Sequence, residues 1–416
     1  MRIMILGSGG REHAIALGLK ASPGLERLYC VPGNPGIAEV AVTAPIALED
    51  HKGLLAYARA QRIDLVIVGP EQPLVDGIAD RFMEAGIKVF GPTSKAARLE
   101  GSKIFSKEFM VRHGIRTAPY GVFSSKEAAL DGLEAFTYPL VIKVDGLAAG
   151  KGVLIPRNRE EAVAALIQIF DERRFSQAGD RILVEAFVQG FEASILCLVD
   201  HETLIPLESA RDYKKALEGD QGLNTGGMGA ISPNDTLTPE IQERIKEEVL
   251  DKTLKGLKEE GLSYTGVLFI GLMIDGNHTP HVLEYNVRFG DPETQSVLPR
   301  LKTDFMQVVQ ATVDNQLSGL DLSWREEMAL TVIVASAGYP ESYEKGVPIG
   351  IEALDEGIVV YHSGTRLEAG ELVTAGGRVL GITGLGLSLE ELREKVYRNL
   401  EGIHFKGMHF RRDIGL

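Results

Sequence analysis

The segment HVLEYNVRFGDPETQ, residues 281–295, carries the residue types and spacing that are best suited to chemistry. Side chains alternate along an extended strand, so Glu284, Asn286 and Arg288 are predicted to project from one face. A carboxylate and an amide oxygen on one face are hard ligands that Mg²⁺ accepts, with water and phosphate oxygens completing its shell. Arg288 would present a two-pronged fork to a substrate carboxylate or to a phosphoryl group in transfer. The alternative is a solvated polar face, which the apolar residues flanking the row disfavour.

A second segment, VIKVDGLAAGKGVLI at 141–155, combines glycines with lysines. It does not match a phosphate-binding P-loop, because Gly152 stands in place of the Ser or Thr and a strand follows instead of a helix. A glycine-rich hairpin can instead fold over a nucleotide as a lid, with backbone N–H groups and Lys151 facing phosphate oxygens. Lys143 lies in the apolar strand before the hairpin, where an ammonium group requires an anion. A solvated lysine at the sheet edge is the alternative.

The N-terminal motif GSGGREH, residues 7–13, leads from a predicted strand into a predicted helix. It departs from a dinucleotide-binding fingerprint, since Glu12 occupies the place of the third glycine. A glycine turn at a helix N-terminus, with Arg11 beside it, suits a single phosphate group. The alternative is a turn that needs its glycines for geometry alone.

The segment RILVEAFVQGFEASIL, residues 181–196, contains a predicted strand that ends in a turn. The backbone from Glu185 to Val188 could face the edge of an adenine, and Glu192 lies just beyond the turn to accept ribose hydroxyls. This signal is weak when it is taken alone.

The loop GLNTGGMGAISP, residues 222–233, is rich in glycine and poor in charge. That composition predicts a backbone that approaches a ligand closely. The preceding stretch SARDYKK adds Asp212, Lys214 and Lys215, for which the start of a surface helix is the alternative interpretation.

Composition narrows the classes of function. The 416 residues carry 44 Lys and Arg against 58 Asp and Glu, a net charge of −14, which disfavours a nucleic-acid groove or a polybasic membrane surface. Cys30 and Cys197 lie in apolar runs without metal-ligand spacing, and they are predicted to be buried, inert thiols. No run reaches the roughly 18 apolar residues of a membrane span. We therefore expect a cytoplasmic protein with no nucleic-acid or membrane partner.

The elements that position these residues follow from hydrophobic periodicity. Up to about residue 92, short apolar runs alternate with helical stretches, which predicts a parallel sheet with ligands beyond the carboxyl ends of its strands. The next part predicts a mainly antiparallel arrangement, with Thr238 as the N-cap of a long helix and Pro239 in its first turn. The expected strands lie at 3–6, 28–31, 65–68, 88–90, 138–146, 152–156, 181–187, 193–199, 265–274 and 281–289. The expected helices start at Glu12, lie near 50–60, near 74–85, at 93–114 and at 159–170, start at Thr238 and lie at 388–403.

The order of lysine strand, glycine lid and E-x-N strand resembles the ATP-grasp carboxylate–amine ligases. More closely, the chain is similar to the phosphoribosylamine–glycine ligase family of purine biosynthesis from residue 1 to about 415. The motifs that carry this resemblance are GSGGREHA, VGPEQPLVDG, FGPT, LEGSKIFSKEFM, DGLAAGKGV, NTGGMGA and RFGDPETQ. Ser8 stands where the family often has asparagine.

The resemblance implies an α/β protein, α+β overall, in three parts. These are an open parallel α/β substrate domain at 1–100, an ATP-grasp region of two α+β subdomains at 101–324, and a small α/β domain at 325–416. The lid subdomain is expected at about 118–189.

The resemblance also implies a site and a reaction. ATP and Mg²⁺ or Mn²⁺ would serve the ligation of glycine to 5-phosphoribosylamine through glycyl phosphate, in a monomer or weak homodimer. Alternatives are another ATP-grasp ligase of purine metabolism, or a nucleotide-binding regulator that has lost catalysis. The implied catalytic residues are Arg288, Lys143 and Asp212; the ATP-binding residues are Lys103, Lys143, Gly150, Lys151, Gly152, Glu185, Val188 and Glu192; the metal ligands are Glu284 and Asn286; and the substrate-binding residues are Gly9, Gly10, Arg11, Glu12, Asn34, Glu71, Lys214, Thr225, Gly226, Gly227, Arg288, Gly290 and Asp291.

Overall fold

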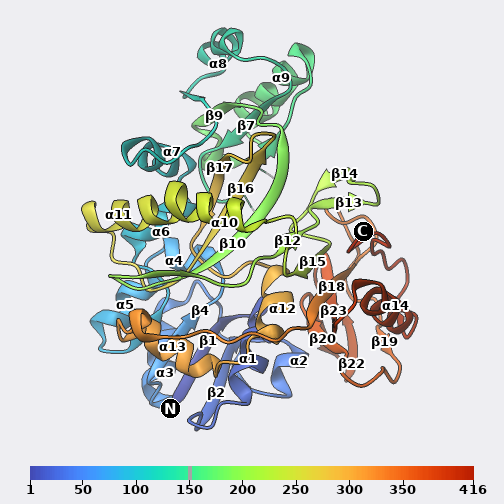
Figure 1. Ribbon diagram of the computed structural model, residues 1–416. Helices are drawn as coiled ribbons and strands as arrows, with labels where there is room; N and C mark the ends of the chain where they lie inside the picture. Colours follow the sequence, from blue (N-terminus) through green and yellow to red (C-terminus); the bar gives the residue numbers. More distant parts are fainter. Residues whose placement is uncertain (149–151) are drawn as a thin grey trace.

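The computed structural model describes residues 1–148 and 152–416, and its N-terminal part is a parallel sheet in the order β3-β2-β1-β4-β5 (Figure 1). Alternate residues of β1 enter two apolar clusters, with Ile3 and Ile5 on one face of the sheet and Met4 and Leu6 on the other. Helices therefore cover both faces, as parallel strands require. The elements are β1 (Arg2–Gly7), α1 (Gly10–Lys20), β2 (Arg27–Pro32), α2 (Pro35–Ala38), β3 (Val42–Thr43), α3 (His51–Gln61), β4 (Leu65–Val68), α4 (Glu71–Val75), α5 (Ile78–Glu84) and β5 (Lys88–Phe90).

The predicted parallel sheet is confirmed, and the differences from prediction have local causes. The helix expected from Glu12 begins two residues earlier, because the Glu12 carboxylate turns back and accepts the N–H of the N-cap residue Gly9 at 2.6 Å. The single helix expected near 74–85 is two helices, since Gly77 takes a left-handed φ of 81° between them. β3 and α2 were not predicted, because two and four residues are too short to show a period.

The glycines at the carboxyl ends of β1 and β4 make room for one side chain. A Cβ atom on Gly69 would lie 2.0 Å from Oε1 of Glu12, and one on Gly7 would lie 2.6 Å from its Cδ. Arg11 Nε is 2.6 Å from the same carboxylate. The turn therefore needs its glycines to accommodate a buried glutamate, which supports the geometric interpretation of this motif.

The lid subdomain is a separate antiparallel sheet at the top of Figure 1, in the order β6-β9-β7-β8. Its apolar side chains form a cluster of their own, drawn from residues 129–184. The predicted strand pair is present, although both strands are shorter than expected. The elements are β6 (Tyr120–Phe123), α8 (Lys126–Gly132), β7 (Leu140–Val144), β8 (Val153–Leu154), α9 (Arg159–Leu166), a π-helical segment (Ile167–Asp171) and β9 (Ile182–Ala186).

The central sheet is antiparallel in the order β11-β10-β16-β17, and it shares apolar clusters with the N-terminal domain. Thr238 caps the long helical stretch by accepting the N–H of Ile241, as predicted. The elements are β10 (Gly190–Val199), β11 (Leu204–Pro206), α10 (Pro239–Ile245), a π-helical segment (Lys246–Leu250), α11 (Asp251–Glu259), β16 (Gly266–Asp275) and β17 (Pro280–Asn286).

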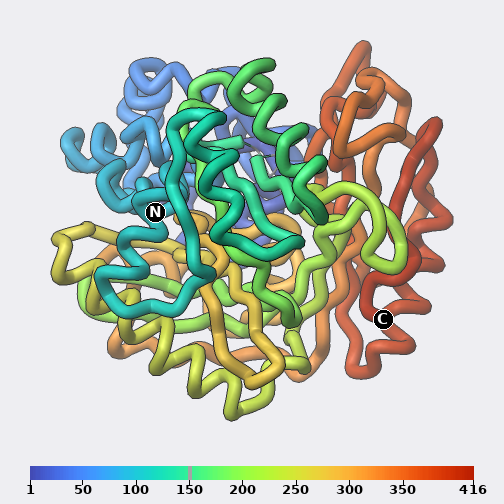
Figure 2. Tube along the Cα trace, turned by 90° about the horizontal axis from the view of Figure 1, so that it is seen from above, coloured from blue at the N-terminus to red at the C-terminus, as the bar shows by residue number. Residues whose placement is uncertain are grey.

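The C-terminal sheet has the order β12-β15-β18-β23-β20 and lies along one side of the molecule (Figure 2). Two of its strands, β12 and β15, come from the predicted ATP-grasp range, so this sheet crosses the boundary expected at 324. The final helix is present as predicted, slightly shortened. The elements are β12 (Arg211–Asp212), β15 (Gly229–Ser232), β18 (Met328–Ala335), β19 (Gly350–Ile351), β20 (Val359–His362), β21 (Thr365–Glu368), β22 (Glu371–Thr374), β23 (Arg378–Gly386), α14 (Leu389–Leu400) and β24 (Ile403–His404).

The remaining helices and one hairpin connect these units. α6 and α7 lead from the N-terminal domain to the lid, and α12 and α13 lead from the central sheet to the C-terminal domain. In the parts of the chain that the structure describes, none of the helices combines the length and hydrophobicity needed to cross a bilayer. The connecting elements are α6 (Ser94–Gly101), α7 (Lys103–Arg112), β13 (Lys215–Leu217), β14 (Gln221–Asn224), α12 (Glu293–Val297) and α13 (Phe305–Val313).

Candidate active site

A cavity of about 440 Å³ lies where the N-terminal domain, the lid, the central sheet and the C-terminal domain meet. Pro70 and Glu71, which follow the carboxyl end of β4, contribute to its wall at the place where the strand order of the parallel sheet reverses from β1 to β4. This is the position at which open parallel sheets bind ligands. The predicted site residues that line it are Arg11, Glu71, Lys103, Lys143, Gly152, Glu185, Asp212, Lys214, Thr225, Gly226, Glu284, Asn286, Arg288 and Asp291.

Other predicted site residues are not part of this wall. Gly150 and Lys151 lie outside the described residues. Among the predicted site residues that the structure describes, those that do not line the cavity are Gly9, Gly10, Glu12, Asn34, Val188, Glu192, Gly227 and Gly290.

The E-x-N strand brings its three polar side chains together at the cavity. A bulge in β17 places both Glu284 and Val282 opposite neighbouring residues of β16, so Leu283 is the extra residue. The amide nitrogen of Asn286 donates to Glu284 Oε1 at 3.4 Å, and Arg288 Nη2 donates to the Asn286 oxygen at 3.1 Å. The row that strand periodicity predicts is thus present up to and just beyond the end of the strand.

Glu284 is held in its ionised form. Burial alone would raise the pKa of this carboxyl, but Lys214, Lys143 and Lys103 together lower the pKa below its ordinary value. An ionised carboxylate next to a carboxamide fits the ligand chemistry of Mg²⁺ or Mn²⁺, with further ligands coming from phosphate and water. In this structure the Asn286 nitrogen faces Glu284 and the Asn286 oxygen accepts from Arg288, so the amide group would have to turn to coordinate a metal. Among the described residues, no group of three or more His, Cys, Asp or Glu side chains forms a complete protein-only metal site.

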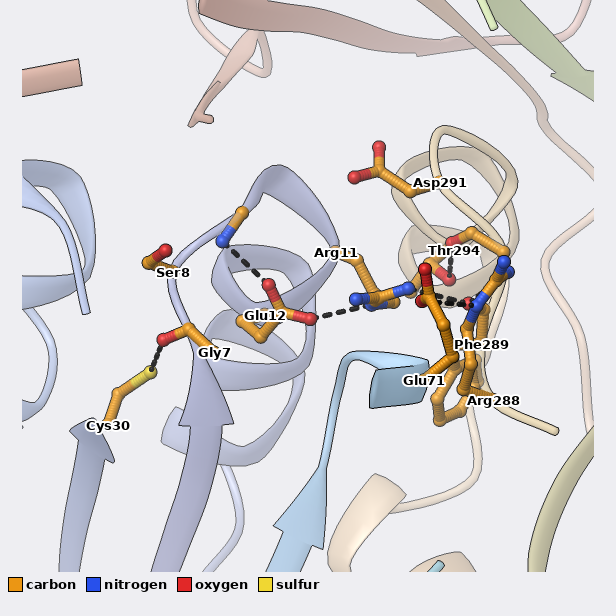
Figure 3. A network of polar contacts seen from close by, with 12 residues as sticks. Gly7, Ser8, Arg11, Glu12, Cys30, Glu71, Arg288, Phe289, Asp291 and Thr294 are labelled. Atoms are coloured by element: carbon orange, nitrogen blue, oxygen red, sulfur yellow. Dashed lines mark hydrogen bonds and ion pairs between the residues drawn. The ribbon is translucent and has the colours of Figure 1, made fainter. Parts of the chain in front are cut away.

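The fork of Arg288 is largely occupied by the protein itself (Figure 3). Nε donates to Glu71 at 3.2 Å, Nη2 donates to Glu100 at 2.9 Å, and Nη1 donates to the carbonyl of Phe289 at 3.2 Å. The predicted role of Arg288 toward a substrate stays a prediction, and in this structure two glutamates from the N-terminal half bind most of the fork. Glu71, expected at the substrate, is likewise paired here.

The two glutamates that hold Arg288 are electrostatically different. Burial opposes ionisation of Glu71, but Arg288 and Arg11 outweigh it and lower the pKa of Glu71 to about 2. Burial raises the pKa of Glu100 to about 7, because Arg288 compensates it only in part and Glu71 adds repulsion. Glu100 also accepts the N–H of Val287 at 2.7 Å, which fixes the chain between Asn286 and Arg288.

Lys143 has an anion beside it, as the sequence requires, and that anion is Glu185. The Lys143 ammonium lies 3.1 Å from Oε1 of Glu185, and Lys107 lies 3.0 Å from Oε2. Lys107 and Glu185 are each only 2% exposed, and burial lowers the pKa of Lys107 to about 8. The Glu185 side chain is thus engaged by two lysines, and its backbone lies in β9, which pairs with β6 and β7 on its two sides, so the role predicted for Glu185 at the nucleoside stays a prediction.

Lys103 reaches the base of the glycine-rich hairpin. Its ammonium donates to the carbonyl of Gly146 at 2.9 Å, while Ser102 donates to Asp145 at 2.9 Å. These two bonds tie the start of α7 to the lid at the edge of the cavity.

The N-terminal turn is braced from within. Asn34 donates to the carbonyls of Ser8 and His362, both at 2.8 Å, and its oxygen caps α2 through Ile37. The Glu12 and Asn34 side chains therefore already have partners within the chain, and their predicted contact with a substrate has no support in this geometry. Arg11 does reach the cavity wall, where Nη1 donates to the carbonyl of Phe289 at 3.2 Å.

Two residues of the C-terminal domain hold the glycine-rich loop at 222–233 against the cavity. Arg378 donates at 2.6 Å to the carbonyls of both Gly226 and Asp291, and Tyr339 accepts the N–H of Gly226 at 2.9 Å. No local motif around Arg378 or Tyr339 marks them in the sequence, so sequence reasoning missed them. Further lining residues that it missed include Glu100, Ser106, Lys107 and Glu293. The four-residue spacing of Lys103 and Lys107 on one helix was a signal for that pair.

The chain is similar to one family of known proteins over its whole length. Models of phosphoribosylglycinamide synthetase match in three blocks: the N domain at 1–100, the ATP-grasp (A) domain at 101–294 and the C domain at 329–416. The phosphoribosylamine–glycine ligases of Caldanaerobacter subterraneus and Chlorobaculum tepidum are each 46% identical to it, over 100% of this chain and 99% of theirs.

Solved structures agree with these matches. The crystal structure of phosphoribosylamine–glycine ligase from Thermotoga maritima superposes with a TM-score of 0.86 at 36% identity, covering 100% of both chains. The biotin carboxylase domain of the Hydrogenobacter thermophilus 2-oxoglutarate carboxylase shares the fold, with a TM-score of 0.76 at 18% identity over 98% of this chain and 91% of that chain.

Replacement of Lys107 by methionine tests whether the Lys107–Glu185 pair supports the cavity wall. The substitution keeps the length of the side chain but leaves a buried carboxylate with Lys143 alone, so we expect the free energy of unfolding to fall by about 3 kcal/mol. Urea unfolding followed by circular dichroism measures it. Arg398→Met, which breaks an exposed pair with Asp355, is the matched control and should change little. Equal, small effects of both variants would contradict a structural role for the buried pair.

Proposed function

We propose here how the cavity binds its substrates and catalyses the reaction. The chain belongs to the phosphoribosylglycinamide synthetase family, and it is an ATP-dependent ligase that joins glycine to 5-phosphoribosylamine in purine biosynthesis. The observation that carries the proposal is the meeting of the E-x-N row with Lys103 and Lys143 beneath the lid. Together these residues offer cations and metal ligands to one triphosphate.

ATP is proposed to lie between the lid and the central sheet, with its phosphates near Lys103 and Lys143. Glu284 and Asn286 would hold Mg²⁺ or Mn²⁺, and the ionised state of Glu284 supports that role. The metal, when bound, would neutralise charge on the phosphate oxygens. Lys103 already contacts the hairpin base at Gly146, so closure of the lid would bring backbone N–H groups toward the same phosphates.

The reaction is proposed to run in two steps. A carboxylate oxygen of glycine attacks the γ-phosphorus of ATP, ADP leaves, and glycyl phosphate forms. The amine of 5-phosphoribosylamine then attacks the carbonyl carbon, phosphate leaves, and the amine gives up one proton, so that glycinamide ribonucleotide, ADP and phosphate result. The chain contributes mainly positions and charges, since phosphoryl transfer depends on in-line geometry and cations more than on covalent help.

Phosphoribosylamine is proposed to approach from the N-terminal side of the cavity. Arg11 and Glu71 form that wall beside the carboxyl end of β4. Arg288 lies between this side and Asn286, and one of its five N–H groups has no partner among the described residues. That group can reach an anion without breaking the bonds to Glu71 and Glu100, so Arg288 is suited to the acyl phosphate.

The substrate requirement tests the proposed activity directly. With ATP and Mg²⁺, ADP release should be sustained only when glycine and phosphoribosylamine are supplied together, because each alone leaves one of the two steps without a partner. A coupled ADP assay measures this. Turnover that ignores glycine, or that requires a different acid, would assign the chain to another ATP-grasp ligase.

Isotope transfer tests the acyl-phosphate route. Glycine labelled with heavy oxygen in its carboxylate should pass one labelled oxygen to the released phosphate, because the bridging oxygen of glycyl phosphate leaves with phosphorus. Mass spectrometry of the phosphate detects the transfer. Unlabelled phosphate from a reaction that still makes glycinamide ribonucleotide would refute the intermediate.

Removal of the Glu284 carboxylate tests the metal site. Glu284→Ala should lower kcat by more than about 100-fold, since the triphosphate loses the anionic ligand of its metal, while the circular dichroism spectrum remains unchanged. The exposed variant Glu202→Ala serves as the control. Normal turnover with an unaltered dependence on Mg²⁺ concentration would exclude Glu284 as a ligand.

A further inference from the structure

Seven carboxylates line the cavity, and they can be sorted by the cation that each one faces. Five have a lysine or arginine nitrogen within 4.0 Å: Glu71, Glu100, Glu185, Asp212 and Asp291. For the other two, Glu284 and Glu293, the described residues provide no such ion pair. Glu284 is accounted for by the proposed metal, which leaves Glu293 unexplained.

Glu293 is a buried carboxylate in the cavity wall, and among the residues that the structure describes no side chain forms a hydrogen bond or ion pair with it. The residue is only 4% exposed. Its carboxylate folds back over Gly290, where an added Cβ would lie 2.4 Å from Oε2. A glycine at 290 is therefore needed to admit the glutamate, and a buried charge in such a place requires a compensating cation.

Asp212 lines the same cavity as Glu293 and is the charged group that repels it most strongly, which makes the need for a cation stronger. Burial, followed by repulsion from Asp212, raises the pKa of Glu293 to about 8, and burial also raises the pKa of Asp212. Lys214 cannot neutralise both carboxylates: it lies 2.7 Å from Glu192 and 4.0 Å from Asp212. Asp212 also accepts the Ser194 hydroxyl, at 3.3 Å, which is a neutral partner. Without a cation, the two carboxylates are best satisfied by sharing a proton.

We propose that Glu293 and Asp212 bind the ammonium group of glycine. This inference rests on the proposed function, since it takes glycine as the acid substrate. The zwitterion carries its positive and negative groups two bonds apart, and the pair of carboxylates is bordered by Lys214 and Arg288, whose charges act on Glu293. The carboxylate of glycine can thus face the cations and the phosphate donor while its ammonium enters the acidic corner.

Binding of the glycine nitrogen as an ammonium group would also prevent it from reacting as a nucleophile. Both substrates present an amine, and only that of phosphoribosylamine is to attack the acyl phosphate. Two carboxylates that keep the glycine nitrogen protonated remove its lone pair, so that it cannot act as a nucleophile. A second metal ion in this corner is less well served, because the described residues show no third acidic, His or Cys ligand grouped with the pair.

The test compares glycine with glycolate, which keeps the carboxylate but replaces the ammonium by a hydroxyl. In Glu293→Gln, we expect the KM for glycine to rise about 10- to 100-fold, the range for a lost hydrogen bond to a charged group. The inhibition constant of glycolate against glycine should stay within about two-fold, and the KM values for ATP and phosphoribosylamine should not change. Asp212→Asn repeats the test at the second carboxylate, and exposed Glu84→Gln is the matched control.

Each outcome decides the inference. Selective loss of glycine affinity in either carboxamide variant supports it, whereas equal weakening of glycine and glycolate indicates a merely structural role and overturns it. A raised KM for phosphoribosylamine with an unchanged KM for glycine also overturns it and assigns the pair to the other amine. Failure of the proposed function would appear separately, as wild-type protein that makes no ADP from the two substrates together.

Discussion

Compensation of buried charge is the constraint on which the rest of this structure depends. The cavity collects lysines, arginines and carboxylates that would be unstable in an apolar interior unless each had an opposite charge nearby. Arg288 is held by Glu71 and Glu100, and Glu185 is held between Lys107 and Lys143. The Arg288 pairs join the end of the central sheet to the N-terminal half, and the Glu185 pairs join two strands of the lid to α7, so the charge network positions the site residues within each of these parts.

The same network explains which groups remain available for ligands. Glu284 is stabilised in its ionised form by three lysines, although no described lysine or arginine nitrogen lies within ion-pair distance of it, whereas repulsion from Asp212 favours a protonated Glu293. Glu284 and Glu293 lie close together in the sequence, but nearby cations act on the first carboxylate and a nearby anion acts on the second. The first is suited to a divalent metal and the second to an organic cation, which agrees with the proposed separation of the triphosphate from the amino acid within a single cavity.

The architecture divides rigid parts from a part that can move. The N-terminal and central sheets share apolar clusters, while the lid has a core of its own and meets the cavity mainly through polar contacts such as Lys103 to Gly146 and Lys143 to Leu283. Polar contacts can be exchanged for contacts to a nucleotide without exposing apolar surface. The C-terminal domain acts differently: Arg378 and Tyr339 fasten the glycine loop at Gly226 as a fixed wall.

The sequence by itself determined the features that depend on local periodicity. The alternation of a strand brings Glu284, Asn286 and Arg288 to one side, Thr238 caps its helix, and apolar runs alternating with helices produce the parallel sheet. Tertiary structure alone decided which charges meet. Glu100 and Arg288 are 188 positions apart, and Gly226 and Arg378 are 152 apart. Such pairs form through space between elements that the fold brings together, and no repeat along the chain encodes that distance, so Arg288 was predicted as an open fork and Glu293 was overlooked.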